Sequence, residues 1–276
     1  MDKYIDQILH CDCVQGMRAL PAACIPLTVT SPPYDKIRRY GGHTFDFPAI
    51  AAQLWRITMD GGVLVWIIQD QVIKGGESGT SASHVVQFRQ IGFRLHQTII
   101  IRTSDLRHCH PNRYYRNFHY AFVFSRGKPS HVNRLTDRRN STWKRPIRKR
   151  NWRSADGTPH SIVIPTMPVR KWGVRGSVWD YTVGYRKSTQ DTEAHQVHPA
   201  LMPESLAEDH ILSWSRPGDL VFDPLCGAGT TCKMALLNNR HYLGMEVHEP
   251  YWEYAKKRLR RARQEYVHKL IDGFAQ

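Results

Sequence analysis

Acidic residues and long apolar runs are both scarce in this sequence. The 276 residues include 39 Lys and Arg against 24 Asp and Glu, which gives a net charge of +15 and a pI of about 9.8. A basic excess of this size predicts a polyanionic partner, nucleic acid first among them. No run of about 18 apolar residues is present, so we expect no membrane span. Residues 1–4 also lack the basic-then-apolar layout of a signal peptide.

Cysteine pairs with the spacing of a metal site or a disulfide framework are missing as well. The six cysteines, at positions 11, 13, 24, 109, 226 and 232, include no CxxC pair. The clusters at 10–13 and 108–110 offer adjacent and i+2 ligands, which suit a closed tetrahedral zinc site poorly. We therefore predict no metal site, and reduced thiols favour a cytoplasmic protein.

Two consecutive prolines mark the most informative turn in the chain. Ser31-Pro32-Pro33-Tyr34 follows the apolar run 25–30, and its prolines remove two backbone donors. The turn presents the Ser31 hydroxyl oxygen and the Pro32 carbonyl as acceptors, and the ring of Tyr34 can lie flat on whatever they hold. This clamp, residues 31–34, suits a planar group with an exocyclic amine, such as cytosine or adenine.

A second motif lies near the other end of the chain. A short apolar strand ends in Asp223 and is followed by a glycine-rich turn (residues 224–229) and a helix. The two glycines let the backbone approach a ligand closely, while the acid suits an ammonium group rather than a phosphate. The next strand ends at Glu246, where a carboxylate suits ribose hydroxyls. A cofactor with an amino-acid head, a ribose and no phosphate is S-adenosylmethionine.

Together these motifs resemble those of the amino-methylating DNA methyltransferases, which act on cytosine N4 or adenine N6. The clamp precedes the cofactor motif, as in the permuted class of that family. The resemblance extends to the segments 8–13 and 198–203 and so covers most of the chain. It implies an α/β fold: the Rossmann-like, mostly parallel sheet of S-adenosylmethionine-dependent methyltransferases, circularly permuted, with an inserted target-recognition region.

The resemblance also implies roles for individual residues. Asp12 is expected to hold the adenine amino group of the cofactor, Glu246 its ribose, and Asp223 its methionine part. The implied catalytic residues are Ser31, Pro32, Pro33 and Tyr34. The implied cofactor-binding residues are Asp12, Thr30, His198, Pro199, Asp223, Pro224, Leu225, Gly227, Gly229, Thr230 and Glu246.

Helix and strand patterns divide the chain into three parts. Residues 1–127 alternate short apolar runs with helical stretches, residues 128–196 lose this alternation, and residues 197–276 recover it. We expect the outer parts to be the catalytic and cofactor-binding halves of one α/β domain, and the middle part to be the target-recognition region. The predicted strands are 27–30, 62–68, 95–102, 120–125, 221–223 and 242–245, and the predicted helices are 47–58, 81–91, 231–238 and 250–269.

Basic residues concentrate in the middle of the chain. Between Arg102 and Arg153 there are fifteen Lys and Arg but only two acids, with Trp and Tyr interleaved. Such side chains neutralise phosphates and read base edges, so we expect double-stranded DNA as the partner. The predicted DNA-binding residues, which include two in a basic loop after the clamp, are Arg38, Arg39, Arg138, Arg139, Lys144, Arg145, Arg148, Lys149 and Arg150.

The clamp predicts direct methyl transfer to a base that has been flipped out of the duplex. No proline–cysteine pair lies near it to serve methylation at cytosine C5. Serine in the first clamp position favours cytosine N4 over adenine N6. We expect a cytoplasmic enzyme of a bacterium, an archaeon or a phage. The sequence leaves open an RNA or protein methyltransferase, an inactive DNA-binding protein, a homodimer and a cognate restriction endonuclease.

Overall fold

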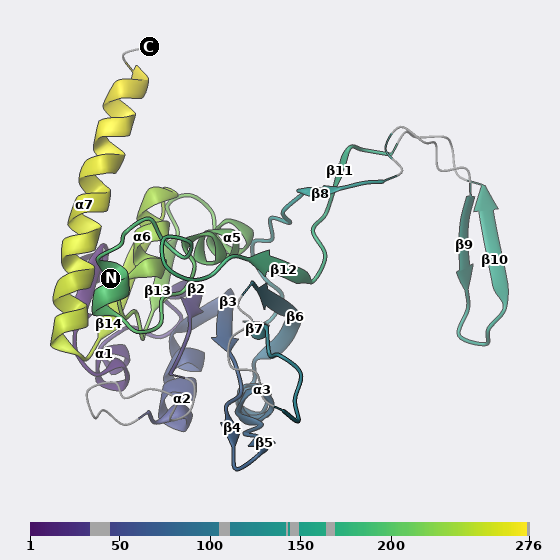
Figure 1. Cartoon of the computed structure of the whole chain (residues 1–276), viewed down its shortest axis with the longest axis horizontal. Coiled ribbons are helices and arrows are strands. Elements are labelled where there is room, and N and C mark those ends of the chain that lie inside the picture. Colours follow the sequence, from purple (N-terminus) through teal and green to yellow (C-terminus); the bar gives the residue numbers. More distant parts are fainter. Residues whose placement is uncertain (34–44, 105–110, 142, 144–148, 164–168, 275–276) are drawn as a thin grey trace. The chain divides into compact units, whose positions relative to one another are not determined.

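The computed structural model describes residues 1–33, 45–104, 111–141, 143, 149–163 and 169–274 (Figure 1). The chain divides into two compact units, one of Met1–Asn133 with Ser177–Gln276 and one of Arg134–Gly176. The smaller unit is narrower than the predicted insertion 128–196. Residues 177–196 belong to the larger unit, where strand β12 (Val178–Tyr181) pairs with the central sheet.

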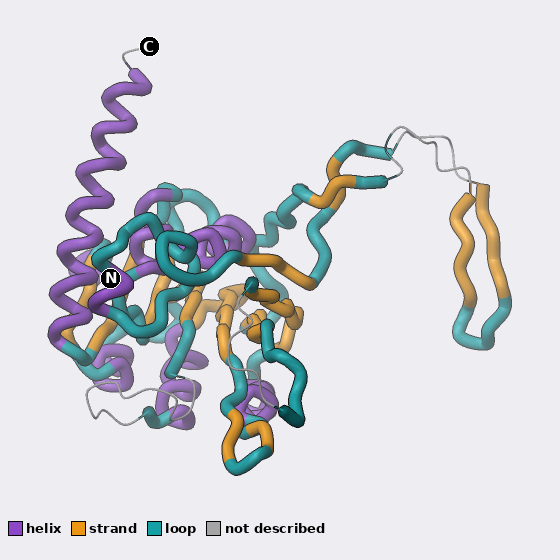
Figure 2. The backbone as a smooth tube through the Cα atoms, in the orientation of Figure 1, coloured by secondary structure: helices purple, strands orange, loops and turns teal. Residues whose placement is uncertain are grey.

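An eight-stranded sheet forms the centre of the larger unit, in the order β1-β14-β13-β2-β3-β7-β6-β12 (Figures 1 and 2). Of these eight strands only β7 runs antiparallel to its neighbours. The predicted mostly parallel α/β sheet, with strands from both ends of the chain, is therefore confirmed. Besides β12, the sheet contains β1 (Gln7–His10), β2 (Ile25–Thr30), β3 (Thr58–Ile68), β6 (Arg94–Thr103), β7 (Phe118–Ser125), β13 (Leu220–Asp223) and β14 (His241–Glu246).

Helices cover both faces of this sheet (Figure 1). On one face α1 (Cys13–Arg18) contacts α2 (Phe47–Ile57), which contacts α3 (Thr80–Ile91). On the other face α5 (Glu204–Trp214) contacts α6 (Thr230–Leu237), which contacts the long helix α7 (Glu249–Phe274). Two short helical segments complete this unit, η1 (Asp2–Tyr4) and α4 (Ala194–Val197).

The core follows directly from the apolar patterning of the sequence. Because helices cover both faces of the sheet, the apolar run Val63–Ile68 of β3 is buried along its whole length. The Trp66 ring, fully buried, packs edge-on against Phe88 of α3, with 5.1 Å between the ring centroids. Helix α2 begins where the Asp46 side chain accepts a hydrogen bond from the Ala49 amide at 3.1 Å, a standard N-cap. Trp179 of β12 is also part of the core, at 7% exposed.

Four neighbouring parallel strands, in the order β1, β14, β13 and β2, bring their carboxyl ends to the same edge of the sheet. His10 of β1 is in register with Glu246 of β14, and Gly244 of β14 is in register with Asp223 of β13. Ligands of open α/β sheets bind outside this edge. Asp12, the clamp, Asp223 and Glu246, each at or just after the end of one of these strands, therefore converge there, although they are up to about 230 residues apart along the chain.

The smaller unit consists of short antiparallel pairs. Strand β8 (Arg138–Arg139) pairs with β11 (Trp172–Gly173), and β9 (Lys149–Arg153) pairs with β10 (Pro159–Val163). In the larger unit β4 (Val72–Ile73) and β5 (Gly76–Glu77) form a small hairpin. Among the described residues, no helix has both the length and the apolar character needed to cross a membrane.

Candidate active site

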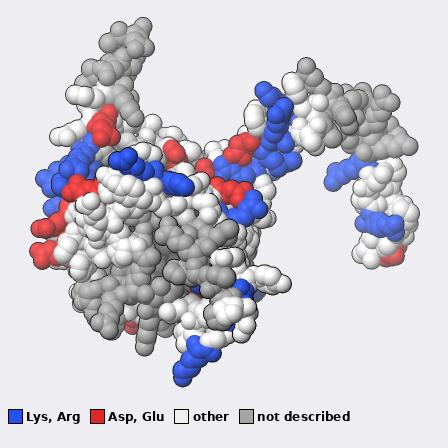
Figure 3. All heavy atoms as spheres, in the orientation of Figure 1, with Lys and Arg blue, Asp and Glu red and all other residues white. Residues whose placement is uncertain are grey.

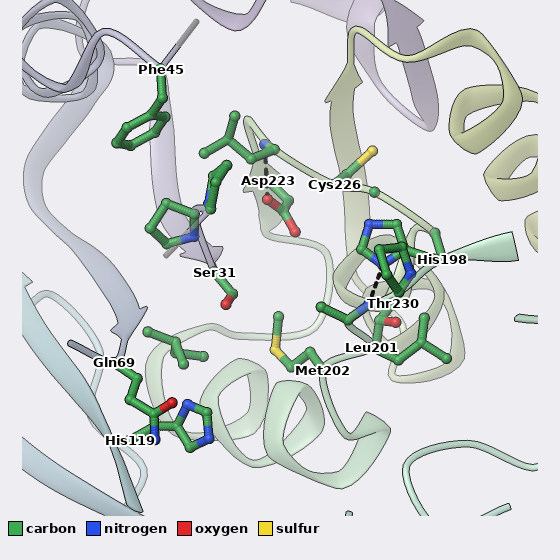
Figure 4. Close-up of a pocket in the computed structure, with 18 of the residues that line it drawn as sticks. Ser31, Phe45, Gln69, His119, His198, Leu201, Met202, Asp223, Cys226 and Thr230 are labelled. Carbon is green, nitrogen blue, oxygen red and sulfur yellow. Dashed lines mark hydrogen bonds between the residues drawn. The ribbon is translucent and has the colours of Figure 1, made fainter. Parts of the chain in front are cut away.

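A large cleft opens at the carboxyl edge of the four parallel strands. Its volume is about 2780 Å³, and Asp12, Ser31, Asp223 and Glu246 all line it. Single small-molecule sites occupy roughly 300–1,000 Å³, so this cleft has room for a cofactor together with a second ligand. Figure 4 shows the Asp223 carboxylate and the Ser31 hydroxyl pointing into the same hollow.

Asp223 is a buried acid at the end of β13, only 2% exposed. The Thr30 hydroxyl donates a hydrogen bond to its Oδ1 at 2.7 Å, and the Leu225 amide donates to the same oxygen at 3.1 Å. Burial nevertheless raises the pKa of Asp223 to about 6, and the nearby carboxylate of Glu246 adds to the rise. A buried carboxylate of this kind is stabilised by a cation, which suits the ammonium group of an amino acid.

The glycine-rich turn connects Asp223 to helix α6. Gly227 and Gly229 have φ values of +51° and +74°, which glycine adopts without strain. A Cβ atom at Gly227 would lie 2.7 Å from Nε2 of His198, so the imidazole ring leaves no room for a side chain there. The Gly227 amide donates to Oε2 of Glu246 at 2.8 Å. The turn is therefore held by Glu246 on β14 and packed against His198.

Asp12 and Glu246 each combine a structural contact with a place on the cleft. Asp12 is the N-cap of α1, accepting from the Gln15 amide at 3.0 Å. Glu246 accepts from the Gly227 amide and, through Oε1, from the His248 amide at 2.8 Å. These bonds fix both carboxylates along the cleft wall.

The structure brings most of the predicted cofactor-binding residues to one place. His198, Pro199 and the segment Asp223–Gly227 line the cleft together with Thr230. Thr30 reaches the site through its bond to Asp223, and Gly229 lies behind the turn, against Ala255 of α7.

The clamp residues that the structure describes also line the cleft. Pro32 is buried, while Ser31 and Pro33 are partly exposed directly after β2. Tyr34, Arg38 and Arg39 lie outside the described residues.

Sequence reasoning missed two polar residues on the floor of the cleft below Ser31, Gln69 and His119 (Figure 4). Gln69 follows β3, and its Nε2 donates to the Phe118 carbonyl at 2.8 Å, which fixes the orientation of its amide. His119 lies on β7, and burial, with Arg116 nearby, lowers its pKa to about 4. The ring is therefore neutral at physiological pH. Only the position of Gln69 just after a buried strand offered a signal in the sequence.

The basic residues of the smaller unit are largely exposed. Arg138, Arg139 and Arg150 are exposed, and so are the rings of Trp152 and Trp172, each 47% exposed. Figure 3 shows Lys and Arg atoms at the surface along this part of the chain. Lys144, Arg145 and Arg148 lie outside the described residues, and Lys149 is placed only as a residue of β9.

With this geometry in view, the chain can be compared with known proteins. A family model described as DNA methylase, of the N6 and N4 methyltransferase type, matches residues 25–257. The chain belongs to this family. Membership confirms the predicted resemblance and the predicted enzyme class: the protein is a DNA methyltransferase that uses S-adenosylmethionine.

One relative is similar over nearly its whole length. The orphan methyltransferase M.BamHII of Bacillus amyloliquefaciens is 45% identical over 253 residues, covering 90% of this chain and 93% of that protein. Two solved structures share the fold. The PvuII DNA methyltransferase (cytosine-N4-specific) has a TM-score of 0.65 at 14% identity, with coverage of 95% of this chain and 92% of the other. TTHA0409 of Thermus thermophilus, complexed with S-adenosyl-L-methionine, has a TM-score of 0.58 at 23% identity, with coverage of 93% and 95%.

Proposed function

We propose that this methyltransferase modifies the exocyclic N4 amine of a cytosine that is flipped out of double-stranded DNA into the cleft. The observation that carries the proposal is the placement of the Ser31–Pro33 part of the clamp beside Asp223 in one large cleft. A base inside a duplex cannot reach such a site, so flipping is required.

The cofactor is proposed to lie along the edge formed by β1, β14, β13 and β2. The residues fit it, because the buried carboxylate of Asp223 offers a partner for the ammonium group and the glycine-rich turn lets the ligand approach the backbone. Glu246 would hold the ribose and Asp12 the adenine amine. The adenine, ribose and methionine parts of the cofactor would thus face the ends of β1, β14 and β13, which are adjacent in that order in the sheet. This order supports the roles that the family resemblance implies.

The clamp prepares the target amine. An exocyclic amine is a weak nucleophile because its lone pair is delocalised into the ring. Acceptance of its two N–H bonds by Ser31 Oγ and the Pro32 carbonyl favours a pyramidal nitrogen whose lone pair is free to react. Bound S-adenosylmethionine supplies the electrophilic methyl group, and much of the rate gain then comes from positioning.

Single-molecule mapping of modified bases tests the choice of cytosine over adenine. The protein is expressed in a host free of DNA methylation, and we expect N4-methylcytosine at one recurring short sequence. Serine in the first clamp position supports cytosine, while the PvuII enzyme shares only the fold at 14% identity and does not decide the base. Detection of N6-methyladenine at one recurring sequence would identify adenine as the target base. The proposed cleft and cofactor site would be unaffected by that result.

The exposed arginines of the smaller unit are proposed to bind DNA phosphates. Replacing Arg139 and Arg150 with alanine should flatten the plot of log affinity against log salt by about 0.9 for each phosphate that is no longer neutralised. A double variant at Arg89 and Arg94, also exposed but on α3 and β6, removes the same charge as a control. The salt slopes are measured by fluorescence anisotropy on a DNA duplex. Equal slopes in the two variants would show that Arg139 and Arg150 act only through the net charge of the protein and do not contact phosphates.

The cellular setting is also a proposal. The described cysteines are free thiols, as expected in a reducing cytoplasm where the DNA substrate lies. The relative M.BamHII is named an orphan methyltransferase.

A further inference from the structure

A fully buried arginine lies behind the glycine-rich turn. Arg258 of α7 is 2% exposed, although most of the basic side chains of this helix face solvent. A buried guanidinium is costly unless its charge is paired and its N–H groups are hydrogen-bonded. The partners of the Arg258 guanidinium therefore indicate its role.

Two of its hydrogen bonds go to the cofactor end of the molecule. Arg258 Nη1 donates to the Ala228 carbonyl at 2.9 Å and to the Thr230 hydroxyl at 3.0 Å. Ala228 lies in the glycine-rich turn, Thr230 is the first residue of α6, and both line the cleft, whereas Arg258 does not. The guanidinium therefore supports the turn from the side opposite the ligand.

The guanidinium is also paired with acids on two other segments, through one hydrogen bond and one ion pair. Nη2 donates to Glu204 Oε1 of α5 at 2.7 Å, and Nε lies 3.3 Å from Asp191 Oδ2. Lys233 of α6 lies 2.6 Å from the same Glu204 oxygen, and the Tyr254 hydroxyl donates to Asp191 at 2.7 Å. Two cations and two anions balance in this cluster.

The hydrogen bonds and charges around Glu204 outweigh the effect of burial on its pKa. Burial alone would raise the pKa of Glu204, but bonds from Lys233 and Thr189 and the charges of Lys233 and Arg258 lower it below its ordinary value. Glu204 therefore stays ionised at neutral pH and keeps Arg258 in place.

The glycine-rich turn is thus held from two sides. Glu246 binds the Gly227 amide from the cleft side, and Arg258 binds the Ala228 carbonyl from behind. Both glycines of the turn have positive φ, so the turn needs outside contacts to keep one conformation. Arg258 lies just beyond residue 257, where the match to the family model ends.

We infer that Arg258 is a positioning residue that holds the glycine-rich turn in the conformation that binds S-adenosylmethionine. The inference rests on the proposed placement of the cofactor against this turn. Arg258 does not touch the reacting atoms, so its loss should act on cofactor binding and leave the chemical step near normal.

The test is calorimetric titration of the purified full-length protein with S-adenosylmethionine. Arg258→Met should raise the dissociation constant about tenfold or more, as expected when hydrogen bonds from a charged group are lost. Arg258→Lys keeps the buried charge but not the guanidinium fork, so it should give a smaller rise. At saturating cofactor, kcat should stay within about threefold of the parent value, so the loss appears in KM.

Arg261→Met is the matched control, because Arg261 lies one turn further along α7, is half exposed and pairs with Glu193 at 2.7 Å. It should leave the dissociation constant unchanged. If Arg258→Met does not fold, Arg258→Lys decides the question. A parental dissociation constant in the folded Arg258 variants, even with a lowered melting temperature, would show a purely structural role and overturn the inference. Unchanged binding in Asp223→Ala would instead refute the placement of the cofactor itself.

Discussion

Replacing Asp223 with alanine should weaken the binding of S-adenosylmethionine by roughly 2–5 kcal/mol, the usual cost of removing one partner of a buried charge pair. The carboxylate is 2% exposed and lies at the wall of the cleft, so water cannot replace it as the partner of the cofactor ammonium group. Calorimetric titration measures the loss directly. Asp60→Ala, which removes a surface carboxylate whose side chain is 90% exposed, should have no effect.

The pH dependence of binding separates this charge from the shape of the side chain. Burial raises the pKa of Asp223 to about 6, so below that pH the side chain is mostly protonated and cannot pair with a cation. Cofactor affinity should therefore rise between about pH 5 and 7, where an α-amino group stays charged, and then level off. Asp223→Asn should bind weakly with a flat profile. A rising profile in this variant would assign the titration to another group.

The same shift links folding to pH. A carboxyl whose folded-state pKa lies above its unfolded value of 3.8 stabilises the fold below that value, and the contribution is lost as the pH rises through about 6. The cofactor-free protein should lose this contribution over the range in which it gains cofactor affinity. The ionised Asp223 carboxylate therefore contributes less to folding stability than the protonated form does, until a bound cation pairs with it.

The parallel part of the sheet was predictable because its sequence signals are local. Apolar runs of four to seven residues, such as 62–68, end at polar residues with chemical roles, and parallel strands place such ends at one edge. The predicted helix 81–91 is one residue short of α3 (Thr80–Ile91), and the predicted strand 95–102 lies inside β6 (Arg94–Thr103). Motif order then placed both ends of the chain in one sheet.

The remainder of the site depends on contacts that no local pattern encodes. His119 lies within an ordinary strand, and only the antiparallel insertion of β7 beside β3 brings it near Gln69. Arg258 belongs to a helix whose basic residues predict a solvated face, yet it is buried against the glycine-rich turn. The smaller compact unit is narrower than the expected region 128–196, because β12 pairs with β6, whose residues lie about 78 positions earlier in the sequence.

Removing the Ser31 hydroxyl should reduce turnover by about 10²–10³ while leaving cofactor and DNA binding near normal. The hydroxyl oxygen is proposed to accept an N–H bond of the target amine, and this bond gains strength as the nitrogen becomes pyramidal in the transition state. Loss of one preorganised hydrogen bond of this kind has a comparable effect in oxyanion holes. Single-turnover measurement of methyl transfer in Ser31→Ala reports the chemical step without product release.

Ser83→Ala is the matched control, because Ser83 is exposed on α3 and does not line the cleft. It should keep the parental rate, and Ser31→Thr, which retains a hydroxyl, should recover part of the activity lost in Ser31→Ala. Full turnover in Ser31→Ala would show that the Pro32 carbonyl suffices as acceptor or that the base binds elsewhere. Detection by mass spectrometry of a covalent adduct between DNA and Cys11 or Cys13 would contradict direct methyl transfer and indicate a mechanism with a cysteine nucleophile. The pKa of Cys13 argues against that outcome, because burial and then the charge of Asp12 raise it to about 12, which leaves little thiolate at neutral pH.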